Sequence, residues 1–381
     1  MPSAPPTYLD HAATTPVAPE VIEAMAALWS SATANASSLH RSGVRAARAV
    51  ETARSQVAQR LGAKPEQIVF TSGGTEANNL AIKGTIAATG RSGGHLICTA
   101  IEHPSVLAPM RWLQARGFDL TILPVDRQGQ VQPDSLRQAL RPDTLLVSII
   151  HGSNELGTVQ DLAVLGEICR RAGAPLHTDA CQSFTKLPVE LATLPVDLVS
   201  INAHKIHGPQ GVGALWLAPG ITLEATAHGG GQERGLRSGT SNTAGIAGFG
   251  VAAASFGPAR RAALQARHAQ LLAGLDRRFP TAHINGPRGN GLPHIVSVTF
   301  PGSDAKRLFQ QLNRAGFEVS TGSACHATAT TPSPALLAVG LEPADALATL
   351  RISHGYTTTP EQIDALLDTL HALLRATPGT T

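Results

Sequence analysis

The sequence lacks any long apolar run, since no stretch approaches the roughly 20 apolar residues that a membrane-spanning helix needs. Its first residues, from Met1 to Pro6, contain neither the basic nor the apolar segment of a secretory signal. We therefore expect a cytoplasmic protein with no membrane partner.

An excess of charge of one sign is also absent. The 30 basic and 27 acidic residues leave a formal net charge of +3, and the arginines are scattered along the chain. No basic face that could follow a phosphate backbone is expected, so a nucleic-acid partner is excluded from the expected functions.

Cysteine is scarce as well. The four cysteines have no close paired spacing, which argues against a disulfide framework and against a CxxC zinc site. Cys98, in a predicted strand, and Cys169, in a predicted helix, are interpreted as small buried hydrophobic residues. Cys181 is also interpreted as structural, which leaves Cys325 to be explained by its surroundings.

What is present is an ordinary globular composition. Among 381 residues, 43% are hydrophobic and 15% are charged, with 37 glycines and 26 prolines. A chain of this length has room for about two domains. We expect it to fold on its own.

Short runs rich in Val, Ile and Leu alternate with helical patterns between residues 65 and 260. The predicted strands are 67–71, 95–100, 120–125, 144–150, 175–179, 196–201 and 212–217, and the clearest helices are 77–88, 105–115 and 162–172. This alternation predicts an α/β fold with a mostly parallel sheet covered on both faces. Ligands of such sheets bind at the carboxyl ends of the strands.

After residue 244 the pattern changes to a long helical region, 244–278, followed by a smaller unit. This unit has a predicted strand at 295–300 and predicted helices at 304–315 and 359–374. The change predicts a second, α+β domain. We place residues 15–258 in the large domain, and residues 1–14 and 259–381 in the small one.

Two segments that follow predicted strands carry candidate binding groups. Residues 71–79, with Gly74 and Thr75, open a predicted helix, so free backbone N–H groups there favour an anion. The spacing is neither a Walker nor a dinucleotide motif, and an ordinary N-capped turn is the alternative. Asp179 ends another strand, where its carboxylate suits a protonated ring nitrogen or simply caps the next turn.

Lys205 is the strongest candidate nucleophile. It follows the buried run 196–201, near Gly208 and Gly211, and partial desolvation there lowers the pKa of an amine toward the value that carbonyl chemistry needs. The other four lysines are predicted to lie on the solvated surface: Lys64, Lys83, Lys186 and Lys306. His204 and His207 flank the site, but no third ligand stands at a usual zinc spacing, so no metal is expected.

The segment from Ser320 to Pro334 is small, polar and poor in residues that pack. It predicts a mobile loop. Cys325 lies within this segment, so burial as a small hydrophobe does not explain it, and we interpret it as a reactive thiol.

Together these segments resemble the cysteine desulfurases of the NifS and IscS type, pyridoxal-phosphate enzymes of the class V aminotransferase family. The resemblance covers nearly the whole chain. Its motifs, in the family's order, are Tyr8-Leu-Asp-His-Ala-Ala-Thr-Thr-Pro16, Phe70 to Asn78, Glu102-His103, Asn154-Glu-Leu-Gly157, Asp179 with Gln182, His204-Lys205, Gly229 to Thr240, Gly322-Ser-Ala-Cys325 and Leu350-Arg351. The resemblance implies the type I fold of pyridoxal-phosphate-dependent transferases, with a mostly parallel seven-stranded sheet and a smaller α+β domain.

The resemblance also implies roles for the residues that would hold pyridoxal 5'-phosphate. Lys205 would bind it covalently and act as the base at the substrate, Asp179 would pair with its ring nitrogen, and Gln182 would donate to its phenolic oxygen. His103 would stack on the ring and shuttle protons. The phosphate ligands would be Gly74, Thr75, His204, Asn202 and Thr240, the last from the neighbouring subunit of a homodimer.

For the substrate, the resemblance implies that Arg351 binds the carboxylate of L-cysteine, with Asn154 and Asn35 beside it. Cys325 would take up the sulfur as a persulfide, releasing L-alanine. The long loop around Cys325 favours transfer to an acceptor protein, such as a scaffold of iron-sulfur cluster assembly.

The sequence departs from the family pattern at three positions. Asn202 stands where a serine phosphate ligand is usual, Tyr356 replaces an arginine, and Asn35-Ala-Ser-Ser38 replaces Asn-Pro-Ser-Ser. An amide still donates hydrogen bonds, so we expect phosphate binding to be retained but altered.

Three other functions stay open at the level of sequence. The segments around Cys325 and 230–234 also resemble selenocysteine lyases, which release selenium and alanine. An ordinary aminotransferase or other lyase would need Lys205 but not Cys325, and a scaffold protein would need neither.

Overall fold

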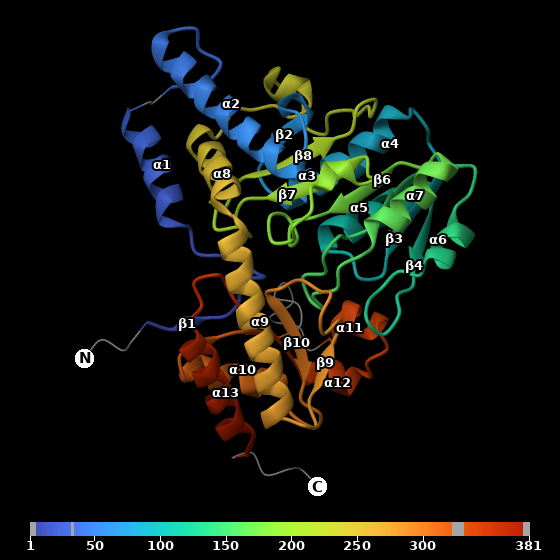
Figure 1. Ribbon diagram of the computed structural model, residues 1–381. Coiled ribbons are helices and arrows are strands. Elements are labelled where there is room, and N and C mark those ends of the chain that lie inside the picture. Colours follow the sequence, from blue (N-terminus) through green and yellow to red (C-terminus); the bar gives the residue numbers. More distant parts are fainter. Residues whose placement is uncertain (1–4, 32–33, 322–330, 376–381) are drawn as a thin grey trace.

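The computed structural model describes residues 5–31, 34–321 and 331–375. The chain forms a larger part around a seven-stranded sheet and a smaller part around a four-stranded sheet, which lies below the larger one in Figure 1. Strands and helices alternate along the larger part, as the sequence predicts.

The seven predicted strands are all confirmed, with ends shifted by no more than two residues. In sheet order they are β2 (Ile68–Thr71), β8 (Gly213–Leu217), β7 (Leu198–Asn202), β6 (Leu176–Asp179), β5 (Thr144–Ser148), β3 (Gly94–Thr99) and β4 (Phe118–Leu123). Strand β8 runs antiparallel to both of its neighbours, and the other pairs are parallel. The predicted α/β class with a mostly parallel sheet is therefore correct.

Helices cover both faces of this sheet. On one face lie α1 (Pro19–Ser31), α2 (Arg41–Leu61), α7 (Leu162–Ala172) and α8 (Thr243–Ser255). On the other face lie α3 (Gly74–Asn79), which continues through a π-helical turn (Leu80–Gly84) into α4 (Thr85–Ala88), and α5 (Pro104–Gln114). Helix α6 (Pro133–Ala139) packs beside α7.

Burial on both faces explains why these strands are apolar throughout. In β2, Ile68 and Phe70 belong to the core beneath α2 and α8, whereas Val69 belongs to the core beneath α3 and α5. Successive side chains of a strand point to opposite faces. A strand with helices on both faces therefore reads as a continuous hydrophobic run instead of an alternating one.

The smaller part is built on an antiparallel sheet with helices packed against it. The sheet order is β12 (Ser320–Thr321), β13 (Thr349–Ser353), β10 (Ile295–Thr299) and β9 (His283–Asn285), and β1 (Thr7–Tyr8) pairs separately with β11 (Phe317–Glu318). The helices are α9 (Pro258–Arg278), α10 (Ala305–Arg314), α11 (Pro334–Ala338), α12 (Pro343–Leu347) and α13 (Pro360–Arg375), and the remaining short turns are 65–67, 191–193 and 232–235. The predicted strand 295–300 and helices 304–315 and 359–374 are confirmed.

The predicted helical region 244–278 is confirmed as helical, but it consists of two helices with a break between them. Helix α8 ends at Ser255 and α9 begins at Pro258, with Gly257 as its N-cap. Proline has no N–H to donate and disfavours helical geometry in the residue before it. A break therefore falls at the Gly257-Pro258 pair, and α9 turns toward the smaller part (Figure 1).

The N-terminal segment connects the two parts. Leu9 lies in the hydrophobic cluster of the smaller part, and Asp10 bridges to Ser353. Five residues later, Thr15 donates its backbone N–H to the carbonyl oxygen of His204 in the larger part, at 2.9 Å. This arrangement favours the division at residue 15, which stays a prediction together with the boundary at 258.

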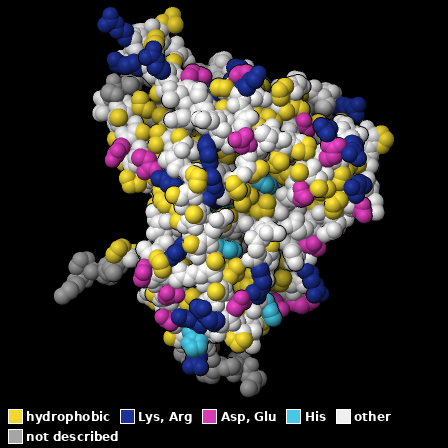
Figure 2. Space-filling view, viewed as in Figure 1, with side chains coloured by type: hydrophobic (Ala, Val, Ile, Leu, Met, Phe, Trp, Pro, Cys, Tyr) yellow, Lys and Arg dark blue, Asp and Glu magenta, His cyan; other side chains and the backbone are white. Residues whose placement is uncertain are grey.

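The helices of the described residues include none that is long and apolar enough to cross a membrane. On the face shown in Figure 2, basic and acidic side chains are interspersed.

Candidate active site

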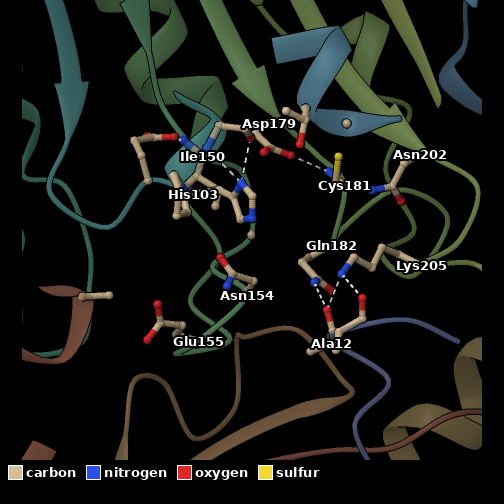
Figure 3. A pocket seen from close by; sticks show the side chains of 18 of the residues that line it. Ala12, His103, Ile150, Asn154, Glu155, Asp179, Cys181, Gln182, Asn202 and Lys205 are labelled. Atoms are coloured by element: carbon tan, nitrogen blue, oxygen red, sulfur yellow. Dashed lines mark hydrogen bonds between the residues drawn. The ribbon is translucent and has the colours of Figure 1, made fainter. Parts of the chain in front are cut away.

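A cavity of about 430 Å³ lies at the carboxyl ends of the parallel strands, between the larger and the smaller part. Ten of the residues singled out from the sequence line it: Gly74, Thr75, His103, Asn154, Asp179, Gln182, Asn202, His204, Lys205 and Arg351. Figure 3 shows several of them converging from separate strands. The rule that ligands bind at the carboxyl edge of such sheets therefore locates the site.

Lys205 reaches the cavity from the turn that follows β7. Its Nζ donates to the carbonyl oxygens of Ala12 and Ala13, at 2.5 and 2.6 Å. Burial, helped by the positive charge of Arg351, lowers the pKa of this amine from 10.5 to about 8. At neutral pH a useful fraction of Lys205 is therefore uncharged and nucleophilic.

Asp179 ends β6 at the base of the cavity and is held in place from both of its oxygens. The backbone N–H of Cys181 donates to Oδ1 at 2.9 Å, and Asn78 Nδ2 donates to Oδ2 at 2.8 Å. The same amide nitrogen of Asn78 also donates to Ser105 Oγ at 2.8 Å. A fixed buried carboxylate of this kind suits a protonated ring nitrogen.

His103 is the N-cap of α5, and this role fixes its imidazole. Its Nδ1 accepts the backbone N–H of Ser105 at 3.1 Å, so the ring proton sits on Nε2. Burial lowers the pKa of His103, partly opposed by Asp179. His103 is therefore neutral at pH 7, with Nδ1 engaged in the cap.

Glu102 precedes His103 in the sequence and also lines the cavity. No role is assigned to it from the sequence. Its Oε1 accepts Thr99 Oγ1 at 2.8 Å and the backbone N–H of Ile150 at 2.7 Å. Burial raises the pKa of this carboxyl to about 8, so it is protonated at neutral pH. Glu102 thus joins the ends of β3 and β5, where the segment carrying His103 begins.

The part of the cavity that is lined by Gly74, Thr75, Asn202 and His204 offers donors for a phosphate. Gly74 opens α3 so close to its neighbours that a Cβ atom would lie 2.6 Å from Cys181 Sγ and 3.3 Å from Asn202 Nδ2. Thr75 and His204 lie beside it, and burial lowers the pKa of His204 to about 3, so it is neutral. The amide of Asn202 is buried, and its nitrogen is the atom that could donate to a phosphate.

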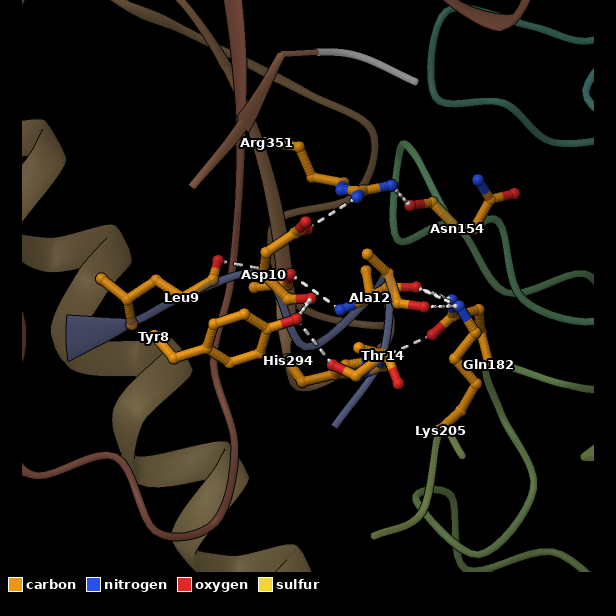
Figure 4. A network of polar contacts seen from close by, with 12 residues as sticks. Tyr8, Leu9, Asp10, Ala12, Thr14, Asn154, Gln182, Lys205, His294 and Arg351 are labelled. Carbon is orange, nitrogen blue, oxygen red and sulfur yellow. Dashed lines mark hydrogen bonds and ion pairs between the residues drawn. The ribbon is translucent and has the colours of Figure 1, made fainter. Parts of the chain in front are cut away.

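Arg351, in β13, brings a positive charge to the cavity from the smaller part. Its Nη2 contacts Asp10 Oδ1 at 2.8 Å, and its Nη1 donates to the carbonyl oxygen of Asn154 at 3.0 Å (Figure 4). Its Nε is buried and has no hydrogen-bond partner among residues 5–31, 34–321 and 331–375. The guanidinium is therefore oriented by two contacts and keeps a donor for a carboxylate.

These groups fit pyridoxal phosphate. The cavity holds an amine for covalent attachment, a carboxylate for the ring nitrogen, and hydroxyl, amide and backbone donors for the phosphate. The absence of a Cβ at Gly74 leaves room for the phosphate beside these donors, and the amide nitrogen of Asn202 lies next to Gly74.

One expectation about the lysines is wrong. Lys186 is not at the solvated surface: it is 3% exposed. Its Nζ lies 2.9 Å from His294 Nε2 and donates to Gln182 Oε1 at 3.5 Å. Its burial comes from contacts with residues distant in the sequence, which local composition does not reveal.

Two predicted site residues do not line this cavity. Asn35 is exposed, and its Oδ1 accepts the backbone N–H of Ser37 at 2.9 Å. Thr240 is exposed in the segment that follows Arg237. Their predicted roles require another copy of the chain and stay predictions. Tyr356, a departure from the family pattern, packs its ring against His207 at 4.3 Å.

The described cysteines are buried, and burial raises the pKa of each: Cys169 to about 12, and Cys98 and Cys181 also upward. Their structural interpretation is consistent with this. Cys325 lies outside the described residues. Both described ends of its segment reach the site, because Ser320 pairs with Arg351 and Ala335 lines the cavity.

The sequence motifs gave no role to several residues of the site: Asp10, Asn78, Glu102, Lys186 and His294. Asp10, Asn78 and Glu102 lie inside the quoted motifs, so a signal for them was present. His294 has no such signal, because it meets Gln182 from 112 residues away.

The chain is similar to known proteins over nearly its whole length. The Aminotransferase class-V family matches residues 7–366. A relative named cysteine desulfurase IscS, from Dictyoglomus turgidum, is 41% identical over 370 residues, which cover 96% of this chain and 94% of the relative. A solved NifS-like protein superimposes with a TM-score of 0.91 at 34% identity, covering 98% of this chain and 100% of that one. A second solved structure, SspA in complex with cysteine, has a TM-score of 0.81 at 38% identity, covering 92% and 99%.

Proposed function

Because this chain belongs to the class V aminotransferase family, we propose that it is a cysteine desulfurase, which uses pyridoxal phosphate to remove sulfur from L-cysteine and release L-alanine. One observation carries the proposal. Lys205, Asp179 and Arg351 face a single cavity, and both described ends of the segment that contains Cys325 reach it.

When bound, pyridoxal phosphate supplies an electron-withdrawing ring that makes the bonds of the attached amino acid labile. Asp179, fixed by Asn78, would place its carboxyl group against the ring nitrogen. Gly74, Thr75, Asn202 and His204 would hold the phosphate. Asp179 and the phosphate ligands would thus together fix the orientation of the ring.

The protein's own groups then bind the substrate and move its protons. Arg351, oriented by Asp10, holds the carboxylate of cysteine and so sets which bond of the substrate faces Lys205. Lys205 takes the proton from the substrate's Cα. The neutral His103 lies on the same cavity wall as Asp179 and moves protons near the departing sulfur.

Cys325 completes the reaction as the sulfur acceptor. Its thiolate attacks the sulfur of cysteine, the bond between that sulfur and Cβ breaks with its electron pair going to the carbon side, and a proton added at Cβ gives alanine. Cys325 keeps the transferred sulfur as a persulfide. Cys325 is four positions after Thr321 in the sequence, so the two residues can be roughly 14 Å apart at most. Thr321 pairs with Leu350, the residue before Arg351.

The proposal includes an acceptor and a second subunit. A persulfide must hand its sulfur to another thiol, so the partner is a sulfur-acceptor protein such as an iron-sulfur scaffold. Thr240 and Asn35, both exposed, would complete the site of the other subunit in a homodimer. The cytoplasm is the location expected from the sequence.

The first prediction tests the acceptor thiol. In the Cys325→Ser variant, the visible absorption of the bound cofactor should stay, while release of alanine from cysteine in the presence of a reducing thiol should fall at least a hundredfold, since the nucleophile is lost. Alanine and protein-bound persulfide are measured together. Cys169→Ala, at a buried cysteine far from the cavity, is the control.

Undiminished alanine release by Cys325→Ser would contradict the proposal. Supplying L-selenocysteine in parallel tests the alternative substrate. A chain that acts on selenocysteine and leaves cysteine unchanged would be a selenocysteine lyase.

A further inference from the structure

Lys186 is a buried amine whose position the proposed reaction does not explain. It lies on the turn after β6, four residues beyond Gln182, and none of the acidic side chains in residues 5–31, 34–321 and 331–375 forms an ion pair with it. Burial, together with the charge of Lys205, lowers the pKa of Lys186 well below its usual value. Keeping an amine here is costly for stability.

Lys186 and His294 both contact the side-chain oxygen of Gln182. Lys186 Nζ approaches Gln182 Oε1 at 3.5 Å, and His294 Nε2 lies 3.1 Å from the same oxygen. Lys186 and His294 are themselves 2.9 Å apart. Whichever ring nitrogen of His294 carries the proton, at least one N–H points at Gln182 Oε1.

The other end of the amide is fixed as well. Gln182 Nε2 donates to the carbonyl oxygen of Ala12 at 2.8 Å (Figure 4). An amide nitrogen has two hydrogens, so one remains for the cavity that Gln182 lines. A flipped amide would place its oxygen against the Ala12 carbonyl, which is repulsive.

We propose that Lys186 and His294 are positioning residues that lock the amide of Gln182 with its NH₂ group toward the cofactor's phenolic oxygen. The inference rests on the proposed function, because it assigns that oxygen as the ligand of Gln182. Lys186 and His294 touch neither cofactor nor substrate, and they act through Gln182.

The test uses Lys186→Met, which keeps the length of the side chain and removes its N–H donors. The apoprotein of this variant should melt at the same temperature as the wild type or higher, since an uncompensated buried amine is gone. The dissociation constant for pyridoxal phosphate should rise about three- to tenfold, as expected for one weakened hydrogen bond. The absorption maximum of the bound cofactor should shift, because hydrogen bonds to the ring tune its electronics.

Three further variants separate positioning from packing. Lys186→Met combined with Gln182→Ala should bind the cofactor no more weakly than Gln182→Ala alone, since the two residues act in series. His294→Leu should resemble Lys186→Met, whereas His294→Gln, which keeps a donor, should retain more affinity. Lys306→Met, the same change at an exposed lysine of α10, is the matched control and should alter nothing.

Wild-type affinity and an unshifted absorption maximum in Lys186→Met would overturn the inference while leaving the proposed function intact. Additive losses in the double variant would overturn it too, because Lys186 would then act independently of Gln182. A wild-type chain that takes up no pyridoxal phosphate would overturn the proposed function, and the inference with it.

Discussion

At the scale of single residues, the site depends on an amine that is kept reactive by its surroundings. Lys205 donates to two backbone carbonyls, which favour its charged form, yet burial lowers its pKa to about 8. A lysine with the usual pKa would have about 0.03% of its amine uncharged at pH 7, and one with a pKa of 8 has about 10%. Burial thus raises the reactive fraction several hundredfold.

The pH dependence of cofactor uptake follows from this value. Because the pKa of Lys205 is about 8, the uncharged fraction, and with it the rate at which the apoprotein takes up pyridoxal phosphate, should increase about tenfold from pH 7 to pH 9. The rate should then level off. Stopped-flow absorbance after mixing apoprotein with cofactor gives the profile, and a rate that still climbs tenfold per unit between pH 9 and 10 would refute the lowered pKa.

At the scale of helices and strands, the position of the site depends on how closely α7 packs beside the segment that leads into β7. Gly166 of α7 faces Pro195, and a Cβ atom there would lie 2.1 Å from the Pro195 carbonyl oxygen. Displacing the backbone of Pro195 to make room for a methyl group would cost stability. Strand β7 begins three residues after Pro195 and carries the chain on to Asn202 and Lys205.

Gly166→Ala should therefore destabilise the protein, although alanine is the better helix former. We expect the free energy of unfolding to fall by about 1–3 kcal/mol from overpacking, measured by guanidinium unfolding of the apoprotein. Gly289→Ala is the matched control, because nothing lies within 4 Å of a Cβ there. Equal stabilities of the two variants would show that α7 shifts away without cost.

The strands and helices differ in how well the sequence predicts them. The seven strands of the large sheet were predictable because burial on both faces makes each a continuous apolar run. The break between α8 and α9 is harder to predict, because both flanking helices are rich in alanine and only the Gly257-Pro258 pair signals it. Gly74, Thr75, Asp179 and Lys205 were predictable because each lies at or just after the end of a predicted strand, whereas the roles of the other cavity residues came from the family resemblance.

Lys186 could not be placed by this reasoning. Its surroundings include His294, 108 residues further along the chain, and pairing between the larger and the smaller part hides it from water. The residues that neighbour Lys186 in the sequence do not indicate its contact with His294.

At the scale of the whole molecule, the junction between the two parts contains buried histidines. His11, His294 and His354 are each no more than 3% exposed, and within the part of the chain that the structure describes neither ring nitrogen of His354 has a hydrogen-bond partner. Burial lowers the pKa of His11 and of His354 to about 3, and lowers that of His294 as well. All three are neutral in the folded protein.

This burial makes folding sensitive to acid. A histidine that is harder to protonate when folded stabilises the native state fully above its unfolded pKa of about 6.5, and that contribution declines as the pH falls toward the folded value. Each buried histidine should cost about 1.4 kcal/mol of unfolding free energy per pH unit below 6.5. Guanidinium unfolding of the apoprotein at pH 7.5, 6.0 and 5.0 measures the slope.

His354→Leu should reduce that slope by one histidine's share, since the residue lies outside the cavity and its replacement cannot titrate. An unchanged slope in this variant would mean that His354 is not a source of the acid sensitivity.

The pairing of Asp10 with Ser353 and Arg351 also has a consequence for synthesis. These partners are separated by more than three hundred residues, so the contact of Arg351 with Asp10, which orients the proposed carboxylate ligand, cannot form until β13 has left the ribosome. Contacts between such distant positions form late and slowly. A nascent chain can thus build the sheet that carries Lys205 before it can place Arg351 beside the cavity.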